Sequence, residues 1–203
     1  MSTVDTSRII SRGTLLDAIA AGWEPQYLPF WGHTAKVPGI GKHVLSQWWP
    51  APFVVSAETF KSAEHYMMAA KARLFADEVA RPKILAAPTP REAKALGRKV
   101  RGFNEEVWAE QRFEIVVEAS IEKFGQNSEL GAYLLKTGDA VLLEASPVDR
   151  VWGIGLAADD PRAMRPGQWR GLNLLGFALM RARTALKTGL RQVGTGRPGL
   201  IPL

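Results

Sequence analysis

Cysteine is absent from this sequence of 203 residues. The chain therefore has no disulfide framework, no thiolate zinc site and no cysteine nucleophile. Histidine is scarce, and His33, His43 and His65 follow none of the spacings that are typical of metal ligands. We accordingly expect neither a bound metal ion nor a cofactor.

Long apolar runs are also lacking. No stretch approaches the roughly 20 apolar residues that span a bilayer. The first ten residues, MSTVDTSRII, have neither the basic start nor the long apolar run of a secretion signal. Together with the missing cysteines, these absences predict a cytoplasmic protein that makes no contact with a membrane.

Acidic residues are missing from the C-terminal part of the chain. The net charge is +6, and eight of the 26 Lys and Arg residues but none of the 20 acids lie beyond Pro161. This basic region suits a phosphate-bearing ligand or nucleic acid. It is equally consistent with a loose basic tail, because TGLRQVGTGRPGLIPL (188–203) is punctuated by Gly and Pro.

The length suffices for one domain with a hydrophobic core, and 46% of the residues are hydrophobic. We expect an N-terminal helix and lead-in over residues 1–26, one domain over residues 27–187, and a basic, flexible tail over residues 188–203.

Helix starts are the clearest local signals. N-cap residues are expected at Thr14, Ser62, Asp77, Thr89 and Asn104. Pro82 interrupts the helix after Asp77, the helix after Thr89 should end near Gly102, and the last helix should span residues 171–187. Short strands are expected at 52–55 and 141–143, with loops elsewhere in 23–60 and 145–170. The pattern predicts a mainly α-helical fold with a small β element.

Glu64 lies in the first turn of the predicted helix KSAEHYMMAAKARLF (61–75). A carboxylate there interacts favourably with the helix dipole, by about 0.3–1 kcal/mol, and this alone explains its presence. However, Lys71 follows two turns later on the same stripe, so the stripe is also consistent with the lining of a cleft. His65 is interpreted as a packed or partner-bonded histidine.

The segment SPVDRVWGIGLAADD (146–160) combines an acid, a tryptophan and two glycines. Trp152 is suited to stacking on a planar base, and Gly153 allows a ligand to approach the backbone. The alternative is a glycine-rich turn with Trp152 in the core. A G-x-G alone does not indicate a dinucleotide site.

Asn173 stands in the first turn of the last predicted helix. Its amide is a candidate for a ribose or base contact, or for bonding to loop backbone. The helix N-terminus is a candidate anion site, because Arg162, Arg165 and Arg170 precede it. An exposed basic loop is the competing interpretation.

The sequence has no defensible Ser-His-Asp order, no P-loop and no zinc pattern. Two carboxylates near aromatic residues fit glycoside chemistry better. Cleavage of a C–N glycosidic bond passes through an oxocarbenium-like state, which a carboxylate stabilises while it takes a proton from the attacking water.

Five ordered segments resemble the NADAR family, also called YbiA-like. They are WWPAPFVV (48–55), SAEHYMMAAKA (62–72), ALGR (95–98), D-x-x-W-G-I-G (149–155) and GLNLLG (171–176). The resemblance implies a compact, mainly α-helical fold with a small β portion, and metal-independent N-glycosidase activity on ribosyl-type nucleotides. One branch of the family is associated with phosphoribosylamino-pyrimidine intermediates of riboflavin synthesis, and another with ADP-ribose on guanine in nucleic acid.

The family's motif glutamate falls on Glu64, its aspartate and tryptophan on Asp149 and Trp152, and its helix-start asparagine on Asn173. Where the family usually has Ser-Asn before the aromatic pair, this chain has Ser46 and Gln47. The connection 152–173 is also longer than the family's. These departures leave the branch open.

We therefore expect Glu64 to activate water and face the developing cation, with Asp149 assisting. The substrate is expected to be a small nucleotide or ADP-ribosylated guanine, and its candidate contacts are Trp48, Phe53, Lys71, Arg98, Trp152, Gly153 and Asn173. Two alternatives stay open: a non-catalytic module that binds ADP-ribose or a nucleotide, and a general nucleic-acid-binding protein.

Overall fold

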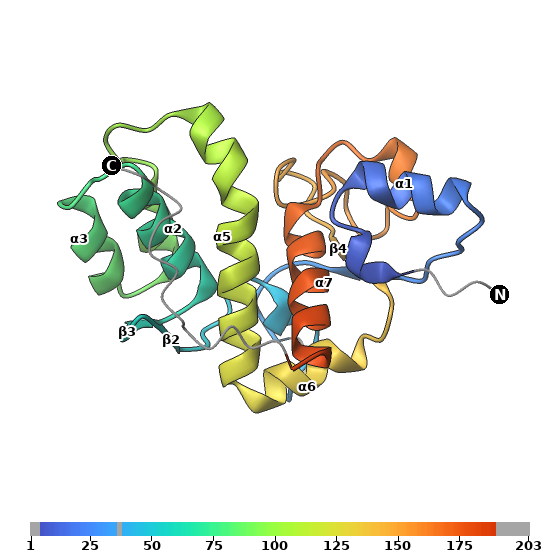
Figure 1. Ribbon diagram of the computed structural model, residues 1–203, viewed down its shortest axis with the longest axis horizontal. Helices are drawn as coiled ribbons and strands as arrows, with labels where there is room; N and C mark the ends of the chain where they lie inside the picture. The colour runs from blue at the N-terminus through green and yellow to red at the C-terminus, as the bar shows by residue number, and fades with distance from the viewer. Residues whose placement is uncertain (1–4, 36–37, 190–203) are drawn as a thin grey trace.

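The computed structural model describes residues 5–35 and 38–189 and is mainly α-helical (Figure 1). The helices of this part are α1 (Arg12–Ala20), α2 (Ala63–Leu74), α3 (Ala80–Ala86), α4 (Pro90–Gly97), α5 (Glu105–Gln126), α6 (Ser128–Lys136) and α7 (Leu174–Lys187), with 3-10 turns η1 (Thr6–Arg8), η2 (Lys42–Leu45) and η3 (Pro166–Gln168). Its strands are β1 (Tyr27–Phe30), β2 (Phe53–Val55), β3 (Glu58–Phe60) and β4 (Val141–Glu144). The expected fold class is thus confirmed.

Three of the predicted N-caps are confirmed. The side chains of Ser62, Thr89 and Asn104 accept the N–H of the third helical residue of α2, α4 and α5. The prediction for Thr14 was wrong, because Ser11 caps α1 and Thr14 closes the capping box from the third helical position. Both residue types can cap a helix, so the sequence alone did not fix the register.

Other helix boundaries differ from the predictions. Asp77 accepts the N–H groups of Val79 and Ala80, but α3 begins only at Ala80. Pro82 therefore lies in the first turn, where its missing N–H leaves no bond unmade. The helix expected to reach Gly102 ends at Gly97, and α7 begins three residues later than expected, at Leu174.

The long helix α5 forms the centre of the molecule. It packs beside α7 along most of its length and against α2 on its other side, while α3 and α4 cover α2 (Figure 1). Both helices contribute buried residues to the core, such as Val116 and Phe124 from α5 and Phe177 and Leu179 from α7. The core therefore holds α2 rigidly, and α2 carries Glu64.

Two separate pairs of strands flank the helices. Strands β2 and β3 form an antiparallel hairpin. Strands β1 and β4 pair in parallel, with Phe30 opposite Glu144, and β4 packs on α7. This pairing brings residues 27–30 to the segment that begins the long 145–170 loop.

No helix among residues 5–35 and 38–189 is long and apolar enough to cross a membrane. The expected basic tail falls almost entirely on residues 190–203, which lie outside the described part of the chain. Helix α7 ends at Lys187, where the tail was expected to begin.

Candidate active site

Glu64 occupies the second position of α2 and is buried, with 1% of its surface exposed. Its backbone N–H donates to the carbonyl of Gln47 at 3.1 Å. Its Oε2 atom accepts the indole N–H of Trp48 at 3.1 Å, while Oε1 is buried and has no hydrogen-bond partner. An unpaired buried carboxylate oxygen is costly. Glu64 is therefore more than a helix-end charge, which would lie in solvent.

The surroundings of Glu64 raise its pKa to about 7. Burial is the main cause, because it disfavours the charged carboxylate, and the negative charge of Asp149 adds to it. The ammonium of Lys94, the hydrogen bond from Trp48 and the guanidinium of Arg98 act in the opposite direction and lower the pKa. Glu64 is thus poised to exchange a proton near neutral pH.

A second buried carboxyl group was not predicted from the sequence. Glu144 is the last residue of β4, and its Oε2 atom is buried without a hydrogen-bond partner. Burial raises the pKa of Glu144 to about 8, Asp149 raises it further, and Lys94 opposes the shift. Because Asp149 and Lys94 both act on Glu64 and Glu144, the four side chains form one electrostatic cluster.

Asp149 is held in place by a tight turn. Its Oδ1 atom accepts the backbone N–H groups of Val151 at 2.9 Å and Trp152 at 2.8 Å. Gly153 follows, and a Cβ atom there would lie 2.7 Å from the carbonyl oxygen of Glu144 and 2.9 Å from that of Asp149. Only glycine permits this approach, so Gly153 lets the loop close against the end of β4.

Asn173 holds the end of β4 in place. It has a left-handed backbone (φ 57°) and is fully buried. Its amide oxygen accepts the N–H of Glu144 at 3.0 Å, and its amide nitrogen donates to the carbonyl of Leu142 at 2.9 Å. Both functional atoms of the amide are therefore engaged with β4, which fixes the backbone of Glu144.

The N-terminus of α7 does not provide the anion site that the sequence suggested. The N–H groups of Leu174 and Leu175 donate to the carbonyls of Val151 and Trp152. The amides that would bind an anion are thus already used to hold the Asp149 loop. Of the arginines that precede α7 in the sequence, Arg162 makes a two-point ion pair with Asp160.

Helix α4 supplies the positive charge of the site. Lys94 lies with its Nζ atom 5.7 Å from the ring centre of Trp48, and the ring centre of His33 lies 5.4 Å from that of Trp48. Helix α4 approaches α2 closely, because a Cβ atom at Gly97 would lie 2.1 Å from the sulfur of Met68. Gly97 therefore allows Lys94 and Arg98 to approach Glu64.

Three predicted substrate contacts differ in their surroundings. Phe53 is 2% exposed and packs against Phe60 and Tyr66 in the core. Lys71 lies roughly 10 Å from Glu64 along the helix axis, with its Nζ atom 3.9 Å from the ring centre of Phe103. Trp152 packs against the core but is only partly buried, so its role as a substrate contact stays a prediction.

His65 is a bonded core histidine, as predicted. It is buried, its Nδ1 atom lies 2.8 Å from the hydroxyl of Ser62, and its Nε2 atom lies 3.1 Å from the carbonyl of Ala87. Burial lowers the pKa of its ring, the carbonyl of Ala87 opposes this, and Lys61 contributes to the lowering.

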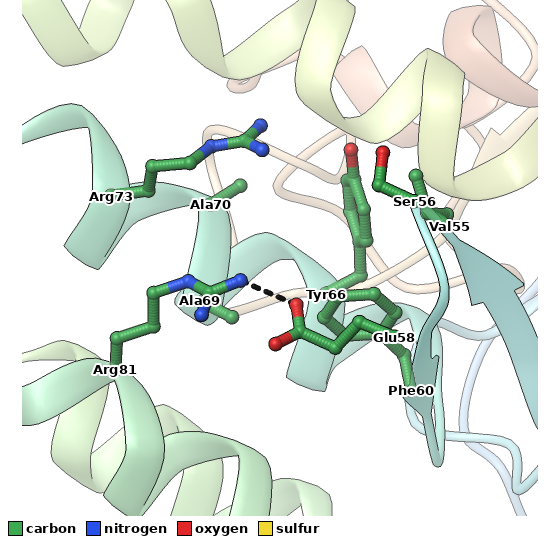
Figure 2. A pocket seen from close by; sticks show the side chains of 9 residues that line it. All are labelled: Val55, Ser56, Glu58, Phe60, Tyr66, Ala69, Ala70, Arg73 and Arg81. Atoms are coloured by element: carbon green, nitrogen blue, oxygen red, sulfur yellow. Dashed lines mark hydrogen bonds and ion pairs between the residues drawn. The ribbon is translucent and has the colours of Figure 1, made fainter. Parts of the chain in front are cut away.

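A small pocket lies on the opposite face of α2, beside the β2–β3 hairpin (Figure 2). Arg81 forms an ion pair with Glu58 there, and the hydroxyl of Tyr66 donates to Glu118. Its volume of about 120 Å³ is below the roughly 300–1,000 Å³ of typical ligand sites. Since its charged groups already have partners, this pocket is a surface crevice rather than the site.

The described residues contain no group of three or more His, Asp or Glu side chains arranged to hold a metal ion. The cluster around Glu64 instead presents two proton-exchanging carboxyl groups, one ionic carboxylate and two cations. Such an arrangement can protonate a leaving group and deprotonate a water molecule.

Residues 29–187, which are most of the chain, match the family model of the NADAR domain. The chain belongs to the NADAR family. Among NADAR-related proteins it is 43% identical to an N-glycosidase of Acanthamoeba polyphaga mimivirus, over 74% of this chain and 92% of the viral protein. It is 31% identical to an N-glycosidase of Nostoc punctiforme, over 85% and 93% of the two chains. These relatives support the expected glycosidase activity.

A riboflavin biosynthesis protein of Vibrio vulnificus is 34% identical over 70% of this chain but only 35% of its own length. The NMR structure of the E. coli protein YbiA has the same fold, with a TM-score of 0.66 and 26% identity over 87% of this chain and 94% of that one. The NADAR fold assignment therefore rests on both sequence and structure.

Proposed function

We propose that this NADAR protein is an N-glycosidase that hydrolyses the C–N glycosidic bond of a ribosyl-phosphate type nucleotide without a metal. The observation that carries the proposal is the state of Glu64. It is a buried carboxyl group with a pKa of about 7, one oxygen fixed by Trp48 and the other unpaired. These properties suit a general base for water, which needs a pKa near the working pH and an oxygen free to accept the proton.

The two glutamates have complementary roles in this reaction. Ionised Glu64 takes a proton from water as the water oxygen bonds to the sugar carbon. Protonated Glu144 gives its proton to the leaving nitrogen as the C–N bond breaks with its electron pair. The pKa of about 7 for Glu64 and about 8 for Glu144 allow both states near neutral pH. Asp149, near both, stabilises the developing sugar cation.

The remaining residues are assigned to substrate binding. Trp48 and Trp152 offer partly buried rings for the leaving base, and Lys94 and Arg98 offer positive charge for a phosphate. Lys71 is far enough along α2 to meet only a distant phosphate of a longer substrate. Phe53 and Asn173 support the site from the core instead.

The family resemblance suggests two substrate classes. One is a phosphoribosylamino-pyrimidine intermediate of riboflavin synthesis, in line with the name of the Vibrio protein. The other is ADP-ribose attached to guanine in nucleic acid. Both contain a ribosyl C–N bond next to phosphate. The positive charges of α4 suit the binding of that phosphate.

The test is to incubate the purified protein with both substrate classes in parallel and to measure release of free base. Glu64→Gln should lower turnover by at least about a hundredfold while substrate still binds. Glu129→Gln, on the exposed face of α6, is the matched control and should be fully active. If the wild type releases no base from either substrate but binds ADP-ribose tightly, the protein is a non-catalytic binding module and the proposal fails.

A further inference from the structure

Lys123, on α5, is a buried lysine that takes no part in the proposed chemistry. It is 1% exposed, and burial lowers its pKa to about 7. Its Nζ atom donates to the carbonyl of Val44 at 2.7 Å and to that of Ser46 at 2.8 Å. These carbonyls belong to the last turn of η2 and its C-cap, so Lys123 closes the end of that turn.

The segment that Lys123 holds, Val44–Ser46, leads directly to the residues that contact Glu64, the proposed general base. The hydroxyl of Ser46 accepts the backbone N–H of Trp48 at 3.2 Å, and its carbonyl also accepts the N–H of Trp49 at 3.3 Å. The next residue, Gln47, accepts the N–H of Glu64 through its carbonyl. Lys123 is therefore linked to Glu64 through Ser46 and then through Gln47 and Trp48, which both bond to Glu64.

The hydrogen bonds of Lys123 single out one segment of the chain. Placing an amine in the core is costly unless it is hydrogen-bonded, and an apolar residue here would leave two carbonyls without this donor. The ring centre of Phe124 also lies 4.9 Å from Nζ. The only polar partners of Nζ among the described residues are the two carbonyls that precede Gln47 and Trp48.

We infer that Lys123 is a positioning residue, which fixes the Val44–Ser46 turn so that Trp48 donates its indole N–H to Glu64. It acts through Trp48 and does not touch the substrate. The effect on turnover rests on the proposed function, whereas the effect on the indole of Trp48 does not.

The test compares Lys123→Met with Arg183→Met. Arg183 is a matched control, because it is 2% exposed and donates to Thr137 and to the carbonyl of Ala140, which both lie between α6 and β4. The indole N–H of Trp48 is followed by ¹H–¹⁵N NMR and assigned with Trp48→Phe. In Lys123→Met we expect a changed indole shift and at least about tenfold faster hydrogen exchange. In Arg183→Met the signal should be unchanged, even if stability falls.

On a substrate found for the wild type, Lys123→Met should lower kcat about tenfold or more with little change in KM, and Lys123→Arg should recover part of it. A wild-type indole signal in folded Lys123→Met overturns the inference. If the indole signal changes but no variant or wild type cleaves any substrate, the proposed function fails and the positioning role stands. If Lys123→Met does not fold, Lys123→Gln replaces it, because the shorter glutamine side chain cannot reach both carbonyls. A changed indole signal then supports the inference, and a wild-type indole signal overturns it.

Discussion

The indole nitrogen of Trp48 lies 3.1 Å from Oε2 of Glu64 and donates a hydrogen bond to it. This bond favours the ionised form of Glu64 and so opposes the rise of its pKa that burial causes. It also fixes one carboxylate oxygen and leaves the other, Oε1, buried and without a hydrogen-bond partner. The pair therefore sets both the charge and the orientation of the proposed base.

Trp48→Phe removes this hydrogen bond while it keeps an aromatic ring. Because the bond lowers the pKa of Glu64, we expect that pKa to rise above its value of about 7. The acidic limb of kcat/KM should move to higher pH, and the basic limb should stay in place. A pH profile from 5 to 10 measures this, and an acidic limb that does not move contradicts the assignment of Glu64 as the base.

Asp149→Asn and Lys94→Met should shift the pH profile in opposite directions. The charge of Asp149 raises the pKa of both Glu64 and Glu144, so its removal should move both limbs to lower pH. The asparagine oxygen still accepts the two backbone N–H groups, so the turn is kept. The charge of Lys94 lowers both pKa values, so Lys94→Met should move both limbs to higher pH. Shifts of the same sign in the two variants would contradict the electrostatic cluster.

Glu144→Gln should stabilise the protein at alkaline pH. The pKa of Glu144 is about 8 in the folded protein and ordinarily 4.5, so its ionisation costs stability as pH rises through this window. Below pH 4.5 the cost is absent, and above pH 8 it is complete. We expect the free energy of unfolding to exceed that of the wild type by roughly 2–4 kcal/mol at pH 9 and to match it at pH 4. Urea unfolding at the two pH values measures this, and an equal gain at both would show that the ionisation is not responsible.

Gly97→Ala should disturb the approach of α4 to α2. The added Cβ would overlap the side chain of Met68, at 2.1 Å from its sulfur, so the helices must separate or Met68 must move. We expect a loss of about 1–3 kcal/mol in the free energy of unfolding, despite the better helix propensity of alanine. Turnover should also fall, since Lys94 and Arg98 move with the helix. Adding Met68→Ala should restore much of the activity, whereas Ala95→Ser, on the exposed face of α4, should change little.

Most of the helices could be predicted because their start signals are local. Ser62, Thr89 and Asn104 each bond to an N–H three residues away, so a short stretch of sequence contains the whole interaction. The start of α1 was misplaced because Ser11 and Thr14 are both suitable caps, and the start of α7 was misplaced because its deciding contacts are distant. Helix α7 begins late, because residues 171–173 are held by the loop around Arg150 and Gly153.

The site was predictable only in part. Glu64 and Asp149 lie in segments that resemble those of a known family, whereas Glu144 follows an ordinary apolar strand. Its burial depends on the pairing of β1 with β4 and on the amide of Asn173, neither of which is visible near residue 144. Lys94 likewise gains its role only when α4 packs on α2.

The parallel pairing of β1 with β4 has a consequence for how the protein reaches its active form. The two strands are separated by more than a hundred residues of chain, and closing so long a loop is entropically costly and slow. Helices α2 and α5 can form and dock before this happens, since their contacts are closer in sequence. We therefore expect Glu64 to reach its place in the core before Glu144 does, so that the proposed pair of carboxyl groups is complete only once the last strand is paired.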